Sequence, residues 1–134
     1  MSRVLALDYG EARCGCAVSD PSGTLATPLE AIERPDTRRG LDRIARLVAE
    51  HAAARVVVGL PVTLDGHEGH QARRTRQWAE RLAERVDVLV VLHDERLTTR
   101  EAQRRGGDAD VDSRSAAVLL ESYLAAAART GASR

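Results

Sequence analysis

The feature that most constrains the fold of this chain is the continuous apolar run at residues 4–7, VLAL, which ends in the carboxylate of Asp8. A run that is apolar on both faces is typical of a central strand in a sheet that is covered from both sides. A turn at residues 10–13 follows, and residues 14–19 return as a second strand. The chain is therefore expected to begin with a hairpin whose first strand lies inside the sheet.

The rest of the chain alternates between strand patterns and helix patterns. Residues 24–33 are compatible with a third strand, in which Pro28 removes a ladder donor and so favours the edge of the sheet. Thr98 and Glu101 form a capping box that opens a short helix, which the glycine pair at 106–107 ends. The other predicted elements are helices over residues 37–51, after a polar loop at 63–69 and over 113–129, and strands over residues 56–61 and 86–92.

This order of elements predicts an α/β fold with a five-stranded mixed sheet that is flanked by helices. The first three strands have tight connections, so they form an antiparallel meander, and two parallel strands are added through helical crossovers. A chain of 134 residues with 43% hydrophobic content is long enough for one core and too short for two ordinary domains. We therefore expect residues 1–134 to form a single domain.

The charges of the chain exclude a general attraction to nucleic acid. Its 20 basic residues, all arginine, are balanced by 20 acidic residues, so a site for a polyanion must be a local arrangement of arginines. With no Phe, one Trp and two Tyr, the chain lacks rows of aromatic residues for base stacking, and recognition is expected through phosphates. Two groups of arginines lie beside the expected strand ends and are candidates for such a site: Arg73, Arg74 and Arg76, and Arg96, Arg100, Arg104 and Arg105. The alternative is that each group belongs to a solvated helix face.

Cys14 and Cys16 alternate on the second predicted strand and therefore point to the same face. Two cysteines are too few for a zinc site, and a disulfide between them would need unusual geometry. We interpret them as small buried hydrophobic residues in a reducing compartment. No apolar run reaches the length of a signal sequence or a membrane span, so the expected location is the cytoplasm, without a membrane partner.

Three acidic positions fall at the ends of predicted elements: Asp8, either Asp94 or Glu95, and Asp112. The carboxyl ends of parallel strands are where open α/β sheets bind ligands. Carboxylates that converge there repel one another unless a cation lies between them, and Mg²⁺ and Mn²⁺ prefer oxygen ligands. Each position also has a structural alternative, because Asp112 or Asp110 can cap the last helix, Asp94 and Glu95 can end a strand in solvent, and Asp8 can be a turn residue. His67 lies in the polar loop and His70 directly after it. Two interpretations stay open for them: a proton donor or extra ligand beside the cleft, or solvated side chains.

Four ordered blocks of the sequence resemble a known family. They are LDYG at 7–10 with RCG at 13–15 and AVSD at 17–20; VGLP at 58–61 with DG at 65–66 and EG at 68–69; DERLTT at 94–99; and VDS at 111–113 with AA at 116–117 and YL at 123–124. Together they are similar to the YqgF or RuvX family, of RNase H-like fold, whose members are described as Holliday junction resolvases and pre-16S ribosomal RNA nucleases.

The resemblance implies a metal-dependent nuclease. Asp8, Glu95 and Asp112 resemble the acidic set of the family that holds one or two Mg²⁺ or Mn²⁺ ions. The positions that resemble substrate contacts are Arg13, Arg96 and Thr98 in the cleft and Asp65 at its border, and we add Arg73 from the first arginine group.

The implied reaction is hydrolysis of phosphodiester bonds in structured nucleic acid, leaving a 5′-phosphate and a 3′-hydroxyl. The implied substrate is the 5′ end of pre-16S ribosomal RNA, with cleavage of branched DNA as a second activity that needs a homodimer. Two other classes are kept as alternatives: a ribosome-assembly module that binds nucleic acid without catalysis, and a nucleotide-binding domain of the actin and sugar-kinase kind.

Overall fold

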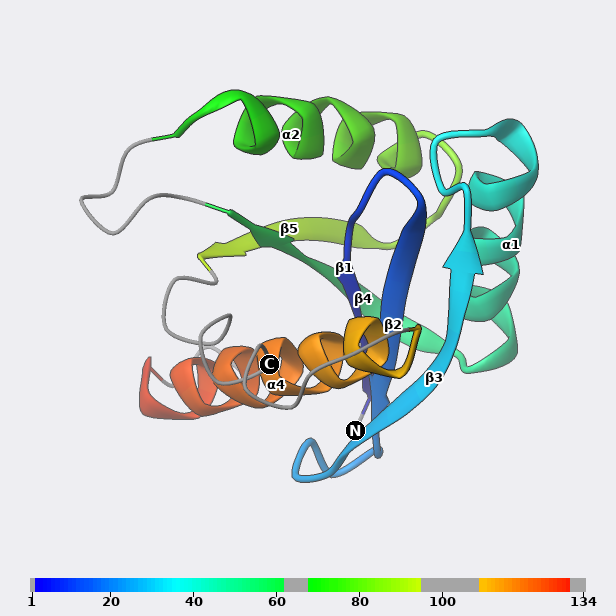
Figure 1. Ribbon diagram of the computed structural model, residues 1–134. Coiled ribbons are helices and arrows are strands. Elements are labelled where there is room, and N and C mark those ends of the chain that lie inside the picture. The colour runs from blue at the N-terminus through cyan, green and yellow to red at the C-terminus, as the bar shows by residue number, and fades with distance from the viewer. Residues whose placement is uncertain (1, 62–67, 95–108, 131–134) are drawn as a thin grey trace.

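The protein folds around one five-stranded mixed sheet, in the strand order β3-β2-β1-β4-β5. The structure, a computed structural model, describes residues 2–61, 68–94 and 109–130. The elements in chain order are β1 (Arg3–Asp8), β2 (Arg13–Ser19), β3 (Ala26–Glu33), α1 (Arg38–Glu50), β4 (Ala53–Leu60), α2 (His70–Ala83), β5 (Leu89–Asp94) and α4 (Ala109–Thr130). Figure 1 shows α1 and α2 on one side of the sheet and α4 on the other.

The predicted topology is confirmed. β1 pairs antiparallel with β2 and parallel with β4, which makes it the central strand, and β5 adds parallel to β4. β3 lies at the edge of the sheet, as Pro28 predicts. The short helix predicted after Thr98 lies outside the described residues.

Three elements begin three or four residues away from the predicted positions. β4 begins at Ala53 rather than at residue 56, because Ala53 already pairs with Arg3 of β1. β5 begins at Leu89 rather than Val86, because the ladder with β4 starts at the pair Arg55 and Leu89, whereas Val86 packs against the core before the strand begins. α4 begins at Ala109, so Asp112 lies within the helix and does not cap it.

Strand alternation divides the core into two layers. On one face, the larger residues of the sheet, such as Leu5, Leu7 and Val58, pack against α1 and α2. On the other face, the small residues Ala6 and Ala17 allow α4 to approach closely, and α4 fills the space with larger side chains. The buried α4 side chains of this layer are Ala116, Leu119 and Leu120. Because full burial of one leucine side chain contributes about 1.5–3 kcal/mol, both layers stabilise the sheet from opposite sides.

Cys14 and Cys16 are both reduced thiols and are completely buried on the α1 and α2 side. The thiol of Cys16 donates to the backbone oxygen of Cys14 at 3.5 Å, so the side chains behave as the small hydrophobic residues that the sequence predicts. Across the three described ranges, no helix combines the length and apolar character needed to span a bilayer.

Candidate active site

The parallel strands β1, β4 and β5 end at the same edge of the sheet, which we call the carboxyl edge. Their last residues are Asp8, Leu60 and Asp94. The turn that follows β1 and the start of β2 lie at the same edge, because β2 runs antiparallel to β1. The carboxyl edge therefore gathers the beginning of β2 and the ends of three parallel strands.

The side chain of Asp8 is half-buried and lies on the α4 face of the sheet. This orientation follows from strand alternation, because Leu5 and Leu7 pack toward α1 and α2 and Ala6 packs toward α4. Asp8 continues the β1 positions that face α4. The strand therefore presents one carboxylate, at its very end, to the side of the sheet that α4 covers.

Both neighbours of Asp8 across the sheet are glycines. Asp8 is the register partner of Gly15 in β2. On the other side of β1, Leu7 pairs with Val58 of β4, so the next residues of the two strands, Asp8 and Gly59, lie beside each other. Side chains of register partners lie on the same face, so the two residues beside Asp8 in the neighbouring strands add no side chain next to its carboxylate. A glycine inside a predicted strand is the sequence signal that could have found this.

His93 is the next residue in this row, beyond Gly59. Its Nε2 lies 3.1 Å from Ser122 Oγ, and its ring meets Tyr123 edge-on at 5.7 Å between centroids. Burial lowers the pKa of His93, and the Asp94 carboxylate opposes that effect. The contacts fix the end of β5 against α4.

The start of α4 is fixed over β3, at the opposite edge of the sheet. The hydroxyl of Ser113 donates to the backbone oxygen of Leu29 in β3. Asp112 directly precedes Ser113 and is part of α4. The helix that carries Asp112 therefore covers the face toward which Asp8 points.

Asp94 and Asp8 belong to opposite faces of the sheet. In β5, Val90 and Leu92 pack toward α1 and α2, whereas Val91 packs toward α4. By the same alternation Asp94 falls on the α1 and α2 side. Of the two residues that the sequence left open at this point, Asp94 does not share the face of Asp8.

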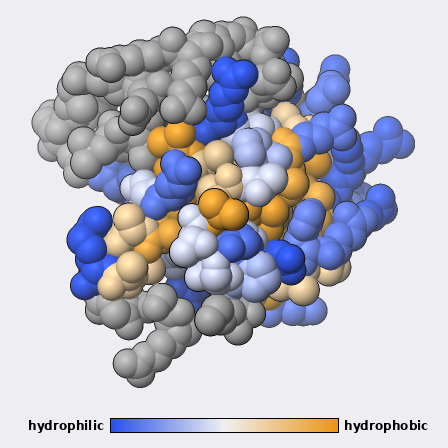
Figure 2. All heavy atoms as spheres, turned by 90° about the horizontal axis from the view of Figure 1, so that it is seen from below, coloured by the Kyte–Doolittle hydropathy of each residue, from blue (hydrophilic) through white to orange (hydrophobic). Residues whose placement is uncertain are grey.

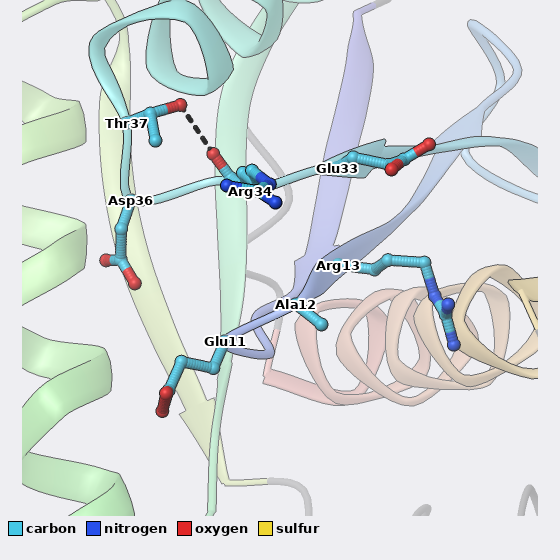
Figure 3. Close-up of a pocket in the computed structure, with 7 residues that line it drawn as sticks. All are labelled: Glu11, Ala12, Arg13, Glu33, Arg34, Asp36 and Thr37. Atoms are coloured by element: carbon cyan, nitrogen blue, oxygen red, sulfur yellow. Dashed lines mark hydrogen bonds between the residues drawn. The ribbon is translucent and has the colours of Figure 1, made fainter.

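Arg13 is exposed and begins β2 at the carboxyl edge. It lies two residues before Gly15, so the strand places it on the α4 face with Asp8. Arg13 also lines a hollow of about 500 Å³. In Figure 3 its side chain points away from Asp36, and Arg34 lies between the start of β2 and Thr37. The other residues that line the hollow are Glu11, Ala12 and Glu33.

Tyr9 links the end of β1 to the opposite layer. Its ring stacks on Trp78 with 4.6 Å between the centroids, and its hydroxyl donates to Asp36 Oδ2 at 2.6 Å. Trp78 Nε1 donates to the backbone oxygen of Pro35 at 2.9 Å. Burial, reinforced by the Asp36 carboxylate, raises the pKa of Tyr9 to about 12. Sequence patterns predict no role for Tyr9, because its partners Asp36 and Trp78 lie more than 25 positions away in the chain.

The arginines that open α2 differ in their contacts. Arg74 pairs with Glu11 at 2.5 Å, and Arg76 binds both carboxylate oxygens of Glu68, at 2.8 and 2.5 Å. The Arg76 hydrogen bond lowers the pKa of Glu68. Arg73 is exposed in the first turn of α2, on the side of the sheet opposite α4.

The structure brings Asp8 and Arg13 to one face and places Asp112 in the helix that covers it. Arg73 comes from the opposite layer. The other predicted site residues, Asp65, Glu95, Arg96 and Thr98, lie outside the described residues, as does His67. Within the described part of the chain no group of three potential metal ligands is assembled.

The donor chemistry fits Mg²⁺ or Mn²⁺. The proposed ligands are all carboxylates, which such ions prefer over nitrogen and sulfur. Gly15 and Gly59, the residues beside Asp8 in β2 and β4, have no side chain of their own. Asp8 therefore supplies the negatively charged oxygen ligand that a hard divalent cation prefers.

The sheet order and the helices on both of its faces define an RNase H-like fold. The chain is similar in structure to Thermus thermophilus RuvC in complex with a Holliday junction substrate, with a TM-score of 0.63 and 16% identity over 98% of this chain and 97% of that one. A second Thermus thermophilus RuvC structure gives a TM-score of 0.61 with 14% identity, over 96% of each chain.

Residues 2–126 match the RuvX family, described as Holliday junction resolvase. The relative from Sulfurihydrogenibium sp., which carries the name "Putative pre-16S rRNA nuclease", is 38% identical over 92% of this chain and 90% of its own length. A relative of the same name from Listeria innocua is 39% identical over 91% of this chain and 96% of its own length. The chain belongs to the RuvX family, as the four sequence blocks predict.

Proposed function

We propose that this chain is a divalent-metal-dependent nuclease that hydrolyses phosphodiester bonds in structured nucleic acid. The observation that carries the proposal is the place of Asp8 at the end of the central strand, between Gly15 and Gly59, on the face that α4 covers. Membership of the RuvX family supports it. Because the one sheet includes strands from Arg3 to Asp94, we treat residues 1–134 as a single nuclease domain.

Asp8, Glu95 and Asp112 are the proposed ligands of one or two Mg²⁺ or Mn²⁺ ions. The place of Asp94 on the other face supports Glu95 as the ligand, because Asp94 is the other of the two residues that the sequence left open and it does not share the face of Asp8. Asp112 is supported by its place near the start of α4, on the Asp8 face. When bound, two ions activate a water and stabilise the leaving oxygen of a phosphodiester.

The residues of the chain then have distinct roles. Asp8 fixes the position of the site, because β1 is held by hydrogen bonds on both sides. Arg13, on the same face, is proposed to bind the substrate phosphate, with Arg96 and Thr98 in the same cleft and Asp65 at its border. Arg73 is proposed as a further substrate contact. The expected products carry a 5′-phosphate and a 3′-hydroxyl.

The proposed substrate is the 5′ end of pre-16S ribosomal RNA, in the cytoplasm. The names of the relatives from Sulfurihydrogenibium sp. and Listeria innocua support it. Cleavage of a four-way DNA junction is proposed as a second activity, supported by the description of the family. Symmetrical cleavage of a junction needs two active sites, and therefore two copies of the chain.

The test compares cleavage of precursor ribosomal RNA, single-stranded DNA and a four-way junction, with Mg²⁺ or Mn²⁺. Asp8→Asn keeps the size of the side chain and removes its charge, so we expect loss of cleavage with an unchanged circular dichroism spectrum. Glu95→Gln should also lose cleavage, and the matched control Asp94→Asn should keep it. Undiminished cleavage by Asp8→Asn would remove the metal-site proposal, and loss in Asp94→Asn with activity in Glu95→Gln would reverse the assignment of the second ligand.

A further inference from the structure

The outer face of α1 carries four exposed arginines, Arg38, Arg39, Arg43 and Arg46. They lie opposite the buried face of the helix, which packs against the sheet. Figure 2 shows hydrophilic side chains projecting along its right margin, the side on which Figure 1 places α1. This surface, which we call the α1 face, concentrates positive charge in a chain whose net charge is zero.

These four arginines have no carboxylate partner among the described residues, since the ion pairs and side-chain hydrogen bonds of that part of the chain engage none of them. Most arginines of α2 and of the turn after it behave differently, because four of them hold a carboxylate: Arg74 with Glu11, Arg76 with Glu68, Arg81 with Asp36 and Arg85 with Asp42. Arg73 is the exception in α2, since the ion pairs of the described residues do not include it. The α1 face differs from α2 in that all of its arginines lack such a partner among the described residues.

The α1 arginines also repel one another. Arg39 and Arg43 are four residues apart and Arg43 and Arg46 are three apart, which are the spacings at which helix side chains meet. Asp42, the acidic residue nearest to them in the helix, is bonded to Arg85, and the first turn of α1 contains no acidic residue. Like charges at these spacings destabilise a helix, so an anionic partner would relieve a cost that the free protein bears.

The α1 face begins at the carboxyl edge, beside the hollow that Arg13 and Arg34 line. Arg34 is held there by its backbone, whose N–H donates to the oxygen of Ala12 at 2.9 Å. The first turn of α1 packs tightly against it, because a Cβ on Gly40 would lie 2.3 Å from the Arg34 oxygen. Arg34 adopts a φ of 50°, a left-handed conformation that most residues avoid. The hollow thus connects the α4 face, where Asp8 lies, with the start of α1.

We propose that the α1 face and Arg34 bind the phosphate backbone of the nucleic acid beyond the point of cleavage. The substrate would pass from Asp8 around the carboxyl edge and along α1. From Arg38 to Arg46 the helix rises by about 12 Å, and a duplex strand places one phosphate about every 3.4 Å of its axis, so the face matches three to four phosphates. A path that bends around the edge of the sheet favours a branched or hairpin substrate. The proposal rests on the proposed nuclease function, since it describes another part of the same substrate.

The test measures binding of a fluorescent RNA hairpin by anisotropy over a series of salt concentrations, in EDTA. Without divalent ions no metal-dependent cleavage takes place, so the titration reports binding alone. Each phosphate contact contributes about 0.9 to the slope of log Kobs against log[salt] on a duplex. Replacing Arg38, Arg39, Arg43 and Arg46 by Gln should therefore reduce the slope by about 3.6. The double variant R39Q/R43Q should reduce it by about 1.8.

Three comparisons separate this role from a structural one. The corresponding fourfold Lys variant keeps the charges and should keep the slope. Arg129→Gln removes an exposed arginine from the last turn of α4, across the sheet, and should leave the slope unchanged. Because the replaced arginines repel one another, the fourfold Gln variant should melt at or above the wild-type temperature while it binds more weakly.

The outcomes distinguish the two proposals. An unchanged slope in the fourfold Gln variant, or an equal loss in Arg129→Gln, would overturn the role of the α1 face and leave the nuclease proposal standing. A reduced slope together with full cleavage by Asp8→Asn would overturn the catalytic assignment and leave the α1 face standing.

Discussion

Replacing Tyr9 by Phe removes one hydroxyl and keeps the ring that stacks on Trp78. The hydroxyl donates to the Asp36 carboxylate at 2.6 Å, and a hydrogen bond to a charged group contributes about 1.5–3 kcal/mol. The Asp36 side chain is 37% exposed, so solvent screening reduces this contribution, and we expect Tyr9→Phe to lower the free energy of unfolding by about 1–2 kcal/mol at neutral pH.

The same contact predicts a pH dependence. The pKa of Tyr9 is raised from 10.0 to about 12, first by burial and then by the Asp36 hydrogen bond, which corresponds to about 2.7 kcal/mol at most. The folded state favours the protonated phenol, so its contribution is fully present below pH 10.0 and is lost as the pH rises through about 12. The difference in stability between wild type and Tyr9→Phe should therefore shrink over this interval.

Urea unfolding at a series of pH values, followed by circular dichroism and by the fluorescence of the single tryptophan, measures this difference. Tyr123→Phe is the matched control, because it leaves Tyr9 as the only tyrosine. The ultraviolet absorbance titration of the Tyr123→Phe variant then reports the pKa of Tyr9 directly. Wild-type stability of Tyr9→Phe at neutral pH, or a stability difference that stays constant up to pH 12, would refute the reasoning.

Two further substitutions test the ends of α1. Thr37 Oγ1 accepts from Gly40 N at 3.1 Å, so Thr37→Ala should cost about 1 kcal/mol in urea unfolding while Thr37→Ser keeps the cap, and equal losses in both variants would contradict a capping role. Ala52 has a φ of 51° just after the helix, where an L-residue costs roughly 1–2 kcal/mol, so Ala52→Gly should stabilise the protein by about 0.5–1 kcal/mol net of the entropy of glycine. Ala54→Gly in β4 should instead destabilise it, and the reverse order of the two glycine variants would contradict the strain.

The central place of β1 was predictable because its signal is local. Four apolar residues before Asp8 require cover on both faces, and α1 and α2 on one face and α4 on the other provide it. Pro28 likewise places β3 at the edge through a rule about one backbone donor. The start of β5 was not predictable, because Val86 is as apolar as the strand that follows and only the ladder with β4 separates them.

The candidate site was predictable in its residue types and less so in its geometry. Asp8 could be found because a carboxylate ends an apolar run. The positions of Gly15 and Gly59 beside Asp8 depend on which strands pair with β1 and in which register, and the sequence alone does not determine that register. Among the described residues, the absence of carboxylate partners on the α1 face has the same origin, since the sequence of a helix does not show whether carboxylates from another element reach its arginines.

The position of β1 between β2 and β4 has a consequence for the order in which the chain is made. β2 emerges directly after β1 and can pair with it at once, and β3 then pairs with β2, so the meander is complete at Glu33. The other edge of β1 waits for β4, which is complete only at Leu60. The 27 residues between these points take about 1–5 s to synthesise. During that time the central strand of the sheet has one open edge, a template for pairing with other chains, and α1 is the first helix that can cover its exposed leucines.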